Sequence, residues 1–598
     1  MQIKKLFYIL VAISLPMGLA QIWFKNNHAY PIYDAANYFI ASQKIFQTFR
    51  ANGLLSTIHD LYTVRSWKPV SLSVFGAPFL IFTDGKVLPA IQMTMTCFLS
   101  LFLVYTFLIF RTGHSSFVSI AATWFIGTIP WLLQSTFVFQ SELPFLAFFV
   151  AALYHFLRSN TFRIKRHSAI CGAWLALAIT LRPVEAVITT CIPLIAICAL
   201  GFKEKVISRS EIISFCLSAL LSVSMFFCIV FDGSLNRLFV LAAGIAAGIA
   251  VFIINYFLFR SHRLKSGFTR FYLIILTVDL LWYLPFSKEL YYWLYTATFG
   301  QYVQVFGRRD GISFLTKNGF LFFGGWGLIF WILTLPFIIK YMMRLDRKKW
   351  MIGTALVAGI SLPLVIGSVS LNTEPRYIFT SVLAFYFGIV SIVLSAPPKP
   401  FAGLLFAPLF LVNCLFTYQL ATADNWVSME RIRQWVKWDE IIPAWRMTPL
   451  RKVDPAKTLV DELRTKISVE HHSRIGLIRM VGKDLSQIMD MEIFQVIVNE
   501  SQLPWHVSSD IDFEPRTPEQ WKDRLQEKFD FLIVGDIDDQ PDRYTVAKYG
   551  KYLSEEFKSD KLSQAGWQIL DKINLVDEVG QSVTFLLLKP EFRRASGH

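Results

Sequence analysis

Long apolar runs recur along the first two thirds of this chain and constrain its fold more than any other feature. A helix of about 17–25 apolar residues is long enough to cross the hydrocarbon core of a bilayer. About thirteen such runs are present, near residues 6–24, 87–110, 115–133, 142–158, 168–186, 187–202, 212–231, 238–259, 271–286, 319–339, 350–369, 376–395 and 401–420. Because 54% of the residues are hydrophobic and 16% aromatic, a soluble protein of this size is excluded. The sequence predicts a polytopic α-helical membrane protein.

Basic residues give this bundle an orientation. The formal net charge is +15, and the basic side chains gather in alternate short connections, which is the signature of topology rather than of nucleic-acid binding. The basic connections contain Arg111, Arg158, Arg163, Lys165, Arg166, Lys203, Lys205, Arg209, Arg260, Arg263, Lys265, Arg270, Lys340, Arg344, Arg347, Lys348, Lys349 and Lys399. The rule therefore places the N-terminus in the cytoplasm and the loops 25–86 and 287–318, with the whole C-terminal region, outside it.

The first apolar run also resembles a secretory signal peptide, with Lys4 and Lys5 before it and Ala20 at a potential cleavage site. The run continues through Phe24, so we expect an uncleaved anchor.

The C-terminal region differs from the rest in composition and pattern. Beyond a membrane part at 1–420 and a linker at 421–454, charged residues are common in 455–598. Helical and strand patterns alternate there: helices are predicted at 455–467 and 520–529, and strands at 474–480, 531–534 and 583–588. This order predicts a small extracytoplasmic α/β domain.

Signals for a metal, a disulfide framework or a nucleotide are weak. The seven cysteines lie in or beside apolar runs and read as small core residues. Gly535 lacks the following glycines of a phosphate-binding loop. The acidic cluster Asp536, Asp538, Asp539 and Asp542 lacks calcium-loop spacing and reads as a solvated turn.

Asp34 is the candidate for chemistry in the first long loop. A carboxylate placed there can act as a general base toward a hydroxyl or amine. It lies four residues before Tyr38, so both share a face of a helix. Asp34 also precedes a helical run at 35–49, and a plain helix-capping role is the equal alternative.

Charged residues at the external ends of other spans are further candidates. Lys68, Arg308, Arg309 and Arg376 can hold an anionic phosphate, although each alone is more often a snorkelling interface residue. Glu142 is an acid at a membrane boundary, which is costly unless it is used or paired, or it is a first-turn acid favoured by the helix dipole. Arg182 has Glu185 nearby, and these two can neutralise each other.

Five short pieces in this order resemble the integral-membrane GT-C glycosyltransferases, particularly the bacterial branch similar to protein mannosyltransferases and aminoarabinose transferases. The pieces are Asp34-Ala35-Ala36-Asn37-Tyr38, Lys68-Pro69-Val70, Glu142-Leu143-Pro144-Phe145, Leu181-Arg182-Pro183 and Pro375-Arg376-Tyr377. They cover spans one to five and the twelfth. Relatives often carry a second acid where this chain has Ala35, and Lys-Pro-Pro where it has Lys68-Pro69-Val70.

The resemblance implies transfer of one hexosyl or pentosyl unit from a polyprenyl-phosphate carrier to a glycan, lipid or protein acceptor at the outer face of a bacterial inner membrane. Asp34 would be the base, and Lys68, Arg376, Arg308 and Arg309 would bind the carrier phosphate. Tyr38, Glu142 and Arg182 would shape the acceptor or donor site. No cofactor is implied, since the lipid-linked sugar is the substrate, and a requirement for a divalent metal stays open. Membrane lipids are expected partners and nucleic acid is not.

Three other functions are compatible with a polytopic chain. A transporter or lipid flippase would place ionisable groups near the bilayer midplane. Asp279 is the single obvious candidate within a span, and it lies nearer the outer end of its segment. A non-catalytic scaffold would have no need of Asp34. An oligosaccharide ligase of related architecture would transfer a whole glycan from a diphosphate carrier.

Overall fold

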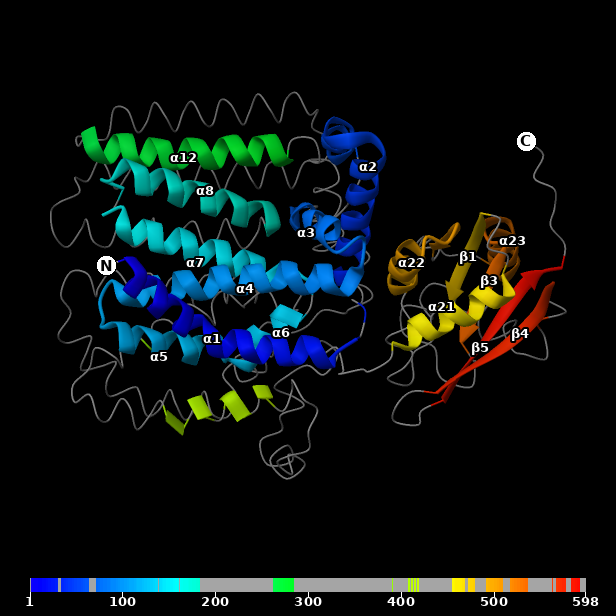
Figure 1. Ribbon diagram of the computed structural model, residues 1–598. Helices are drawn as coiled ribbons and strands as arrows, with labels where there is room; N and C mark the ends of the chain where they lie inside the picture. The colour runs from blue at the N-terminus through cyan, green and yellow to red at the C-terminus, as the bar shows by residue number, and fades with distance from the viewer. Residues whose placement is uncertain are drawn as a thin grey trace. The chain divides into compact units, whose positions relative to one another are not determined.

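The fold was analysed in a computed structural model (Figure 1). The structure describes residues 2–182 with gaps at 29, 31–33, 64–70, 138 and 161, residues 262–283, isolated positions between 390 and 418, and residues 454–591 with gaps at 468–471, 479–490, 509–516, 536–561, 563–565 and 577–581. The predicted spans between 187 and 259 and between 319 and 395 lie outside these residues, apart from the single position 390, and the predicted loop 287–318 also lies outside them.

The first part of the chain is helical. Its helices are α1 (Gln2–Asn26), α2 (Asp34–Thr63), α3 (Ser71–Phe82), α4 (Val87–Arg111), α5 (Ser116–Gly127), α6 (Pro130–Phe137), α7 (Glu142–Arg158), α8 (Lys165–Leu181) and α12 (His262–Tyr283). Within the described residues, the stretches Ile3–Asn26 and Val87–Arg111 are long and apolar enough to cross a bilayer. These two helices coincide with the first two predicted spans.

Helices α7, α8 and α12 lie side by side (Figure 1). A glycine permits the close approach of α8 to α12: a Cβ atom on Gly172 would lie 2.6 Å from the carbonyl oxygen of Phe271. Small residues of this kind let the backbones of membrane helices come together.

Three predicted spans have different bounds in the structure, and prolines account for two of these differences. The span expected at 115–133 is two helices, because Pro130 has no N–H and disfavours helical geometry at Ile129. Helix α8 ends at Leu181 rather than at 186, since Pro183 restricts Arg182 in the same way. Helix α12 begins at His262 rather than at 271. Its first turns are polar, so the hydropathy pattern missed them, but their residue types are compatible with a helix.

The segment 25–86, expected to be mostly loop, is largely helical. The predicted run at 35–49 is the first part of α2, which continues to Thr63 across a break at Gly53 (φ 79°, ψ −176°). Helix α3 begins at Ser71, after the gap at 64–70 in the described residues.

The chain divides into two compact units that are not continuous in sequence. One unit consists of Met1–Ile22, Ile58–Leu72 and Met95–Met447, and the other of Trp23–Thr57, Ser73–Thr94 and Thr448–His598. The second unit therefore combines the first part of α2 and most of α3 with the C-terminal region.

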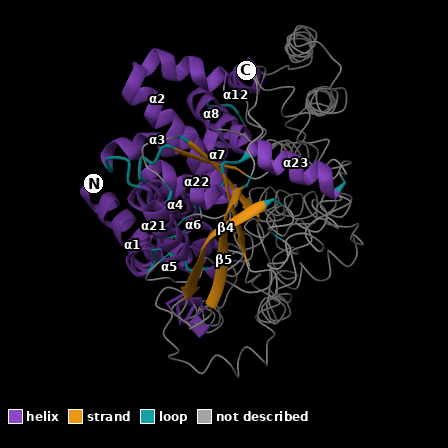
Figure 2. Cartoon of the chain, turned by 90° about the vertical axis from the view of Figure 1, so that its right-hand side faces the viewer, coloured by secondary structure: helices purple, strands orange, loops and turns teal. Residues whose placement is uncertain are grey.

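The C-terminal region forms one mixed sheet. Its strands are β1 (Ser473–Ile478), β2 (Trp505–Ser508), β3 (Phe531–Gly535), β4 (Trp567–Val576) and β5 (Ser582–Pro590), and its helices are α21 (Pro455–Lys466), α22 (Met491–Glu500) and α23 (Pro518–Lys528). The strand order is β2-β1-β3-β5-β4. Strands β1, β2 and β3 pair in parallel, while β5 pairs antiparallel with β3 and β4. Every strand in the described residues belongs to this sheet (Figure 2).

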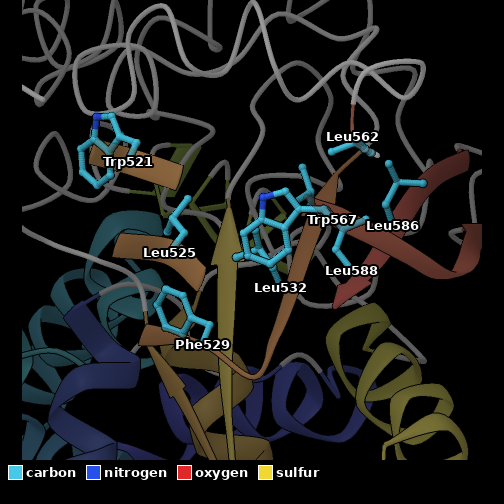
Figure 3. Packing of buried hydrophobic residues seen from close by; sticks show 9 residues of the cluster. Trp521, Leu525, Phe529, Leu532, Leu562, Trp567, Leu586 and Leu588 are labelled. Carbon is cyan, nitrogen blue, oxygen red and sulfur yellow. The ribbon is translucent and has the colours of Figure 1, made fainter. Parts of the chain in front are cut away.

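Apolar side chains of α23 and three strands build the core of this sheet (Figure 3). Trp521 and Trp567 are its largest members and are each 1% exposed. The other members are Leu525, Phe529, Leu532, Val534, Leu562, Leu586 and Leu588. A capping box between Thr517 and Gln520 starts α23, so the helix begins where its apolar side can cover the sheet.

Candidate functional site

Asp34 is the first residue of α2, and the structure describes its backbone. An acid in the first turn of a helix is favoured by the helix dipole. A general base can also lie at the first residue of a helix that packs against other elements. Both interpretations of Asp34 therefore stay predictions.

Two buried serines fix the helix one turn after Asp34. The Ser73 hydroxyl of α3 donates to the Tyr38 carbonyl oxygen at 2.7 Å. The Ser42 hydroxyl donates to the Ser73 carbonyl oxygen at 3.0 Å and also lies 3.1 Å from the Tyr38 carbonyl oxygen. Both serines are 0% exposed. These bonds join the start of α3 to the first turns of α2, and Tyr38 itself is half-buried.

Glu142 and Arg182 meet in the other unit. Glu142 is the first residue of α7, and Arg182 directly follows the last residue of α8. Their side chains form an ion pair with Nη2 and Oε1 3.2 Å apart, at 9% exposure for the arginine and 6% for the glutamate. Within the described residues, the second oxygen of Glu142, Oε2, has no hydrogen-bond partner. The pair thus leaves one buried carboxylate oxygen without a donor among the described residues.

A hydrogen bond joins the same end of α8 to the first residue of α3. The Ser71 hydroxyl donates to the carbonyl oxygen of Thr180 at 2.5 Å, and the serine is buried. Ser71 lies three residues after Lys68 in the chain, and Thr180 lies two residues before Arg182.

The remaining predicted site residues are not among those that the structure describes. Lys68, Arg308, Arg309 and Arg376 all lie in the gaps, as does Glu185, the expected neighbour of Arg182. Asp279 lies in α12, and the structure describes only its backbone. The structure thus brings together Glu142 and Arg182, and it gives the helical setting of Asp34 and Tyr38.

No group of three or more His, Cys, Asp or Glu side chains suited to a metal ion occurs in the part of the chain that the structure describes. The acidic cluster at 536–542 lies outside that part.

Sequence reasoning missed the serines and a set of polar residues on α22. Ser42, Ser71 and Ser73 carry no motif, since single serines are common in apolar helices. Helix α22 holds the half-buried amides Gln495 and Asn499 beside the buried apolar residues of the same helix. Amides at such positions are the one signal that could have drawn attention to it, because buried polar groups need partners.

Comparisons with known proteins give structural likeness only. No protein-family model matches the chain, and no curated protein matches it. Among solved structures, ArnT from Cupriavidus metallidurans in the apo state is similar with a TM-score of 0.52 and 12% identity, covering 100% of both chains. The same protein bound to undecaprenyl phosphate gives a TM-score of 0.49 at 11% identity, covering 99% of each chain.

The archaeal oligosaccharyltransferase AglB from Archaeoglobus fulgidus, in complex with an inhibitory peptide and a dolichol-phosphate, has a TM-score of 0.47 at 12% identity, covering 97% of this chain and 74% of that one. At these identities the likeness concerns the fold alone, and the apo ArnT structure carries the assignment. The chain has a GT-C-like fold.

Proposed function

We propose that this protein is a GT-C-type glycosyltransferase of a bacterial inner membrane, which moves one sugar from a polyprenyl-phosphate carrier to a glycan, lipid or protein acceptor outside the cytoplasm. The observation that carries the proposal is the GT-C-like fold, which is similar to that of apo ArnT over the full length of both chains. The five short motifs support it, because they occur in the order and predicted topology typical of such enzymes.

The proposed reaction is a single displacement with inversion. The acceptor oxygen or nitrogen forms a bond to the anomeric carbon as the bond between that carbon and the phosphate oxygen breaks. Asp34 takes the acceptor proton, and the electron pair of the broken bond leaves on the polyprenyl phosphate. A phosphate-linked sugar already has a good leaving group, so the protein needs to align the acceptor and stabilise charge rather than supply a nucleophile.

Cationic side chains have the second task. Lys68 and Arg376, with Arg308 and Arg309, would neutralise the charge that develops on the departing phosphate. In this scheme no cofactor takes part. Tyr38, Glu142 and Arg182 would shape the acceptor or donor site, and this role is supported by the Oε2 atom of Glu142, which has no hydrogen-bond partner among the described residues.

The first test removes the base. Purified Asp34→Asn protein should release free polyprenyl phosphate from a panel of polyprenyl-phosphate sugars roughly 10²–10⁴-fold more slowly than wild type, the range that a general base contributes. Binding of the carrier should be unchanged, because the substitution leaves the cationic residues in place.

Asp84→Asn is the matched control. Asp84 is exposed and has a positive φ of 51°, a backbone geometry that asparagine also tolerates, so release should stay at the wild-type rate. Equal rates in Asp34→Asn and wild type would remove the base assignment. A wild-type protein that releases nothing from any donor, yet relocates lipid or solute, would be a transporter instead.

A further inference from the structure

Helix α22 places its polar side chains in specific hydrogen bonds instead of in solvent. Ile493, Phe494 and the stretch Val496–Val498 are buried. Glu492, Val496 and Asn499 are spaced i, i+4 and i+7, which puts them on one face of the helix. That face meets the first turns of α2.

Three hydrogen bonds join α22 to α2. Asn37 Nδ2 donates to Glu492 Oε1 at 3.1 Å. Asn499 Nδ2 donates to Gln43 Oε1 at 3.1 Å, and Gln43 Nε2 donates to the Val496 carbonyl oxygen at 3.1 Å. Gln43 is 4% exposed, so its amide needs both bonds.

The sheet fixes the orientation of these amides. The backbone N–H of Val507 on β2 donates to Gln495 Oε1 at 2.8 Å, and Gln495 Nε2 donates to Asn499 Oδ1 at 2.7 Å. Asn499 thus has its acceptor side satisfied from α22 and its donor side aimed at α2. A chain of amides runs from strand β2 to Gln43.

Glu500 at the end of α22 contacts Tyr30, which precedes α2, and Val87, which begins α4. Glu500 accepts a hydrogen bond from the Tyr30 hydroxyl through Oε2 and one from the Val87 N–H, at the start of α4, through Oε1 at 3.0 Å. Asp454 accepts from the Tyr30 N–H at 2.7 Å. Burial, followed by the nearby Glu500 carboxylate, raises the pKa of Tyr30, which keeps its hydroxyl a donor. Asp34 therefore lies between two anchored residues, Tyr30 and Asn37.

We propose that α22 is a positioning element for the reaction: Glu492, Asn499 and Glu500 hold Tyr30, Asn37 and Gln43, and through them set the placement of Asp34. This inference rests on the proposed function. All these residues belong to one compact unit. Misplacing a reacting group by about 1 Å costs about 10²-fold in rate, so the residues that hold the helix control turnover without touching the substrate.

The experiment pairs Glu492→Leu with Glu492→Gln in the full-length protein. Leucine cannot accept the hydrogen bond from Asn37, whereas the glutamine side-chain oxygen can. We expect Glu492→Leu to lower kcat about tenfold or more, with KM for the donor unchanged, because the loss lies in the alignment of the base. Glu492→Gln should stay within about twofold of wild type, which shows that the hydrogen bond matters and the charge does not.

The control variant Gln526→Leu distinguishes an effect on the position of α2 from a general loss of protein stability. Gln526 Nε2 donates to the Gly566 carbonyl oxygen at 3.0 Å, so this variant removes a side-chain hydrogen bond of the same unit without involving α2. It should lower the Tm as Glu492→Leu does and leave kcat unchanged. A kcat that follows Tm in both variants would overturn the inference.

Hydrogen exchange supplies a readout that needs no activity. Amides 34–43 should exchange about tenfold faster in Glu492→Leu than in wild type and Gln526→Leu, because local opening of α2 becomes easier. Equal exchange in all three proteins would overturn the inference even if wild type is active. Faster exchange in Glu492→Leu together with an inactive wild type would overturn the proposed function while the hold of α22 on α2 stands.

Discussion

Glu142 and Arg182 are two charged side chains that lie almost wholly out of solvent, and each is tolerated there because of the other. Removing water from a single charge costs several kcal/mol, roughly, unless a partner compensates it. The pair lies 3.2 Å apart between the start of α7 and the end of α8. It therefore links the start of α7 to the end of α8.

Breaking this pair should destabilise the protein more than breaking an exposed one. Arg182→Gln leaves Glu142 uncompensated and should lower the free energy of unfolding by about 3–5 kcal/mol. In the double variant Glu142→Gln/Arg182→Gln, the loss should be smaller than the sum of the two single losses. Thermal unfolding in detergent, followed by circular dichroism, measures both.

Arg50→Gln is the control for that comparison. Arg50 and Asp84 are 3.9 Å apart with 67% and 89% of their side chains exposed, and such surface pairs contribute about 0–1 kcal/mol. A loss as large as that of Arg182→Gln would contradict the argument from burial.

The sequence indicated Glu142 and Arg182 separately, but not as a pair. Arg182 had Glu185 three residues away, and local spacing favours local pairing. Its partner Glu142 lies forty residues earlier in the chain, a contact that depends on the packing of α7 against α8. The same limit applies to Asn37, whose partner on α22 is 455 residues away. The sequence indicated which charged residues lie at the ends of membrane spans, but it did not indicate which residues they pair with.

At the scale of elements, α2 is interrupted within a single helical stretch. Gly53 has φ 79° and ψ −176°, a region of backbone geometry that is essentially restricted to glycine. The helix before this break carries Asp34, Asn37 and Gln43. The break therefore separates the anchored first part from the remainder.

Gly53→Ala tests the break. A Cβ atom at this position would meet nothing within 4 Å, so the cost comes from the backbone alone and should be about 1–3 kcal/mol. Gly18→Ala is the matched comparison, because its Cβ also meets nothing but its φ is not positive. That variant should stay within about 1 kcal/mol of wild type. Equal Tm values for the two variants would show that Gly53 is not strained.

Elements with a strong pattern were predictable, and those without one were not. The helix expected at 455–467 is α21, and the strands expected at 474–480, 531–534 and 583–588 are β1, β3 and β5. Strand β2 has only 4 residues, too few for a pattern to show. Strand β4 mixes polar and apolar residues on a sheet edge, and α22 is short and apolar, so its period is ambiguous.

At the scale of the whole molecule, the basic residues predict which side of the membrane each region faces. Lys572 on β4 and Arg166 on α8 are both exposed. A cysteine at Lys572 should react with a membrane-impermeant maleimide in right-side-out bacterial membrane vesicles, and a cysteine at Arg166 should react only in inside-out vesicles. The native cysteines lie in apolar segments and serve as the background. Reversed labelling would invert the topology and place Asp34 in the cytoplasm.

The two-unit arrangement was not predictable from composition. The sequence favours division of the chain at residues 420 and 455, where the apolar runs end, and those boundaries stay predictions. In the structure, the compact unit that contains the C-terminal region also includes Trp23–Thr57 and Ser73–Thr94. Composition reports which residues enter a membrane, but it says nothing of which distant segments pack together.

The hydrogen bonds between α22 and the N-terminal segments also have a consequence in time. Val87 and Glu500 are 413 residues apart, and Tyr30 and Glu500 are 470 apart. At synthesis rates of roughly 5–20 residues per second, α2 leaves the ribosome about 20–90 s before the helix that holds it. Gln43 and Asn37 must wait for that interval without their partners. The contact between α22 and α2 therefore forms late in synthesis, and a chain that stops before α22 leaves α2 without these hydrogen bonds.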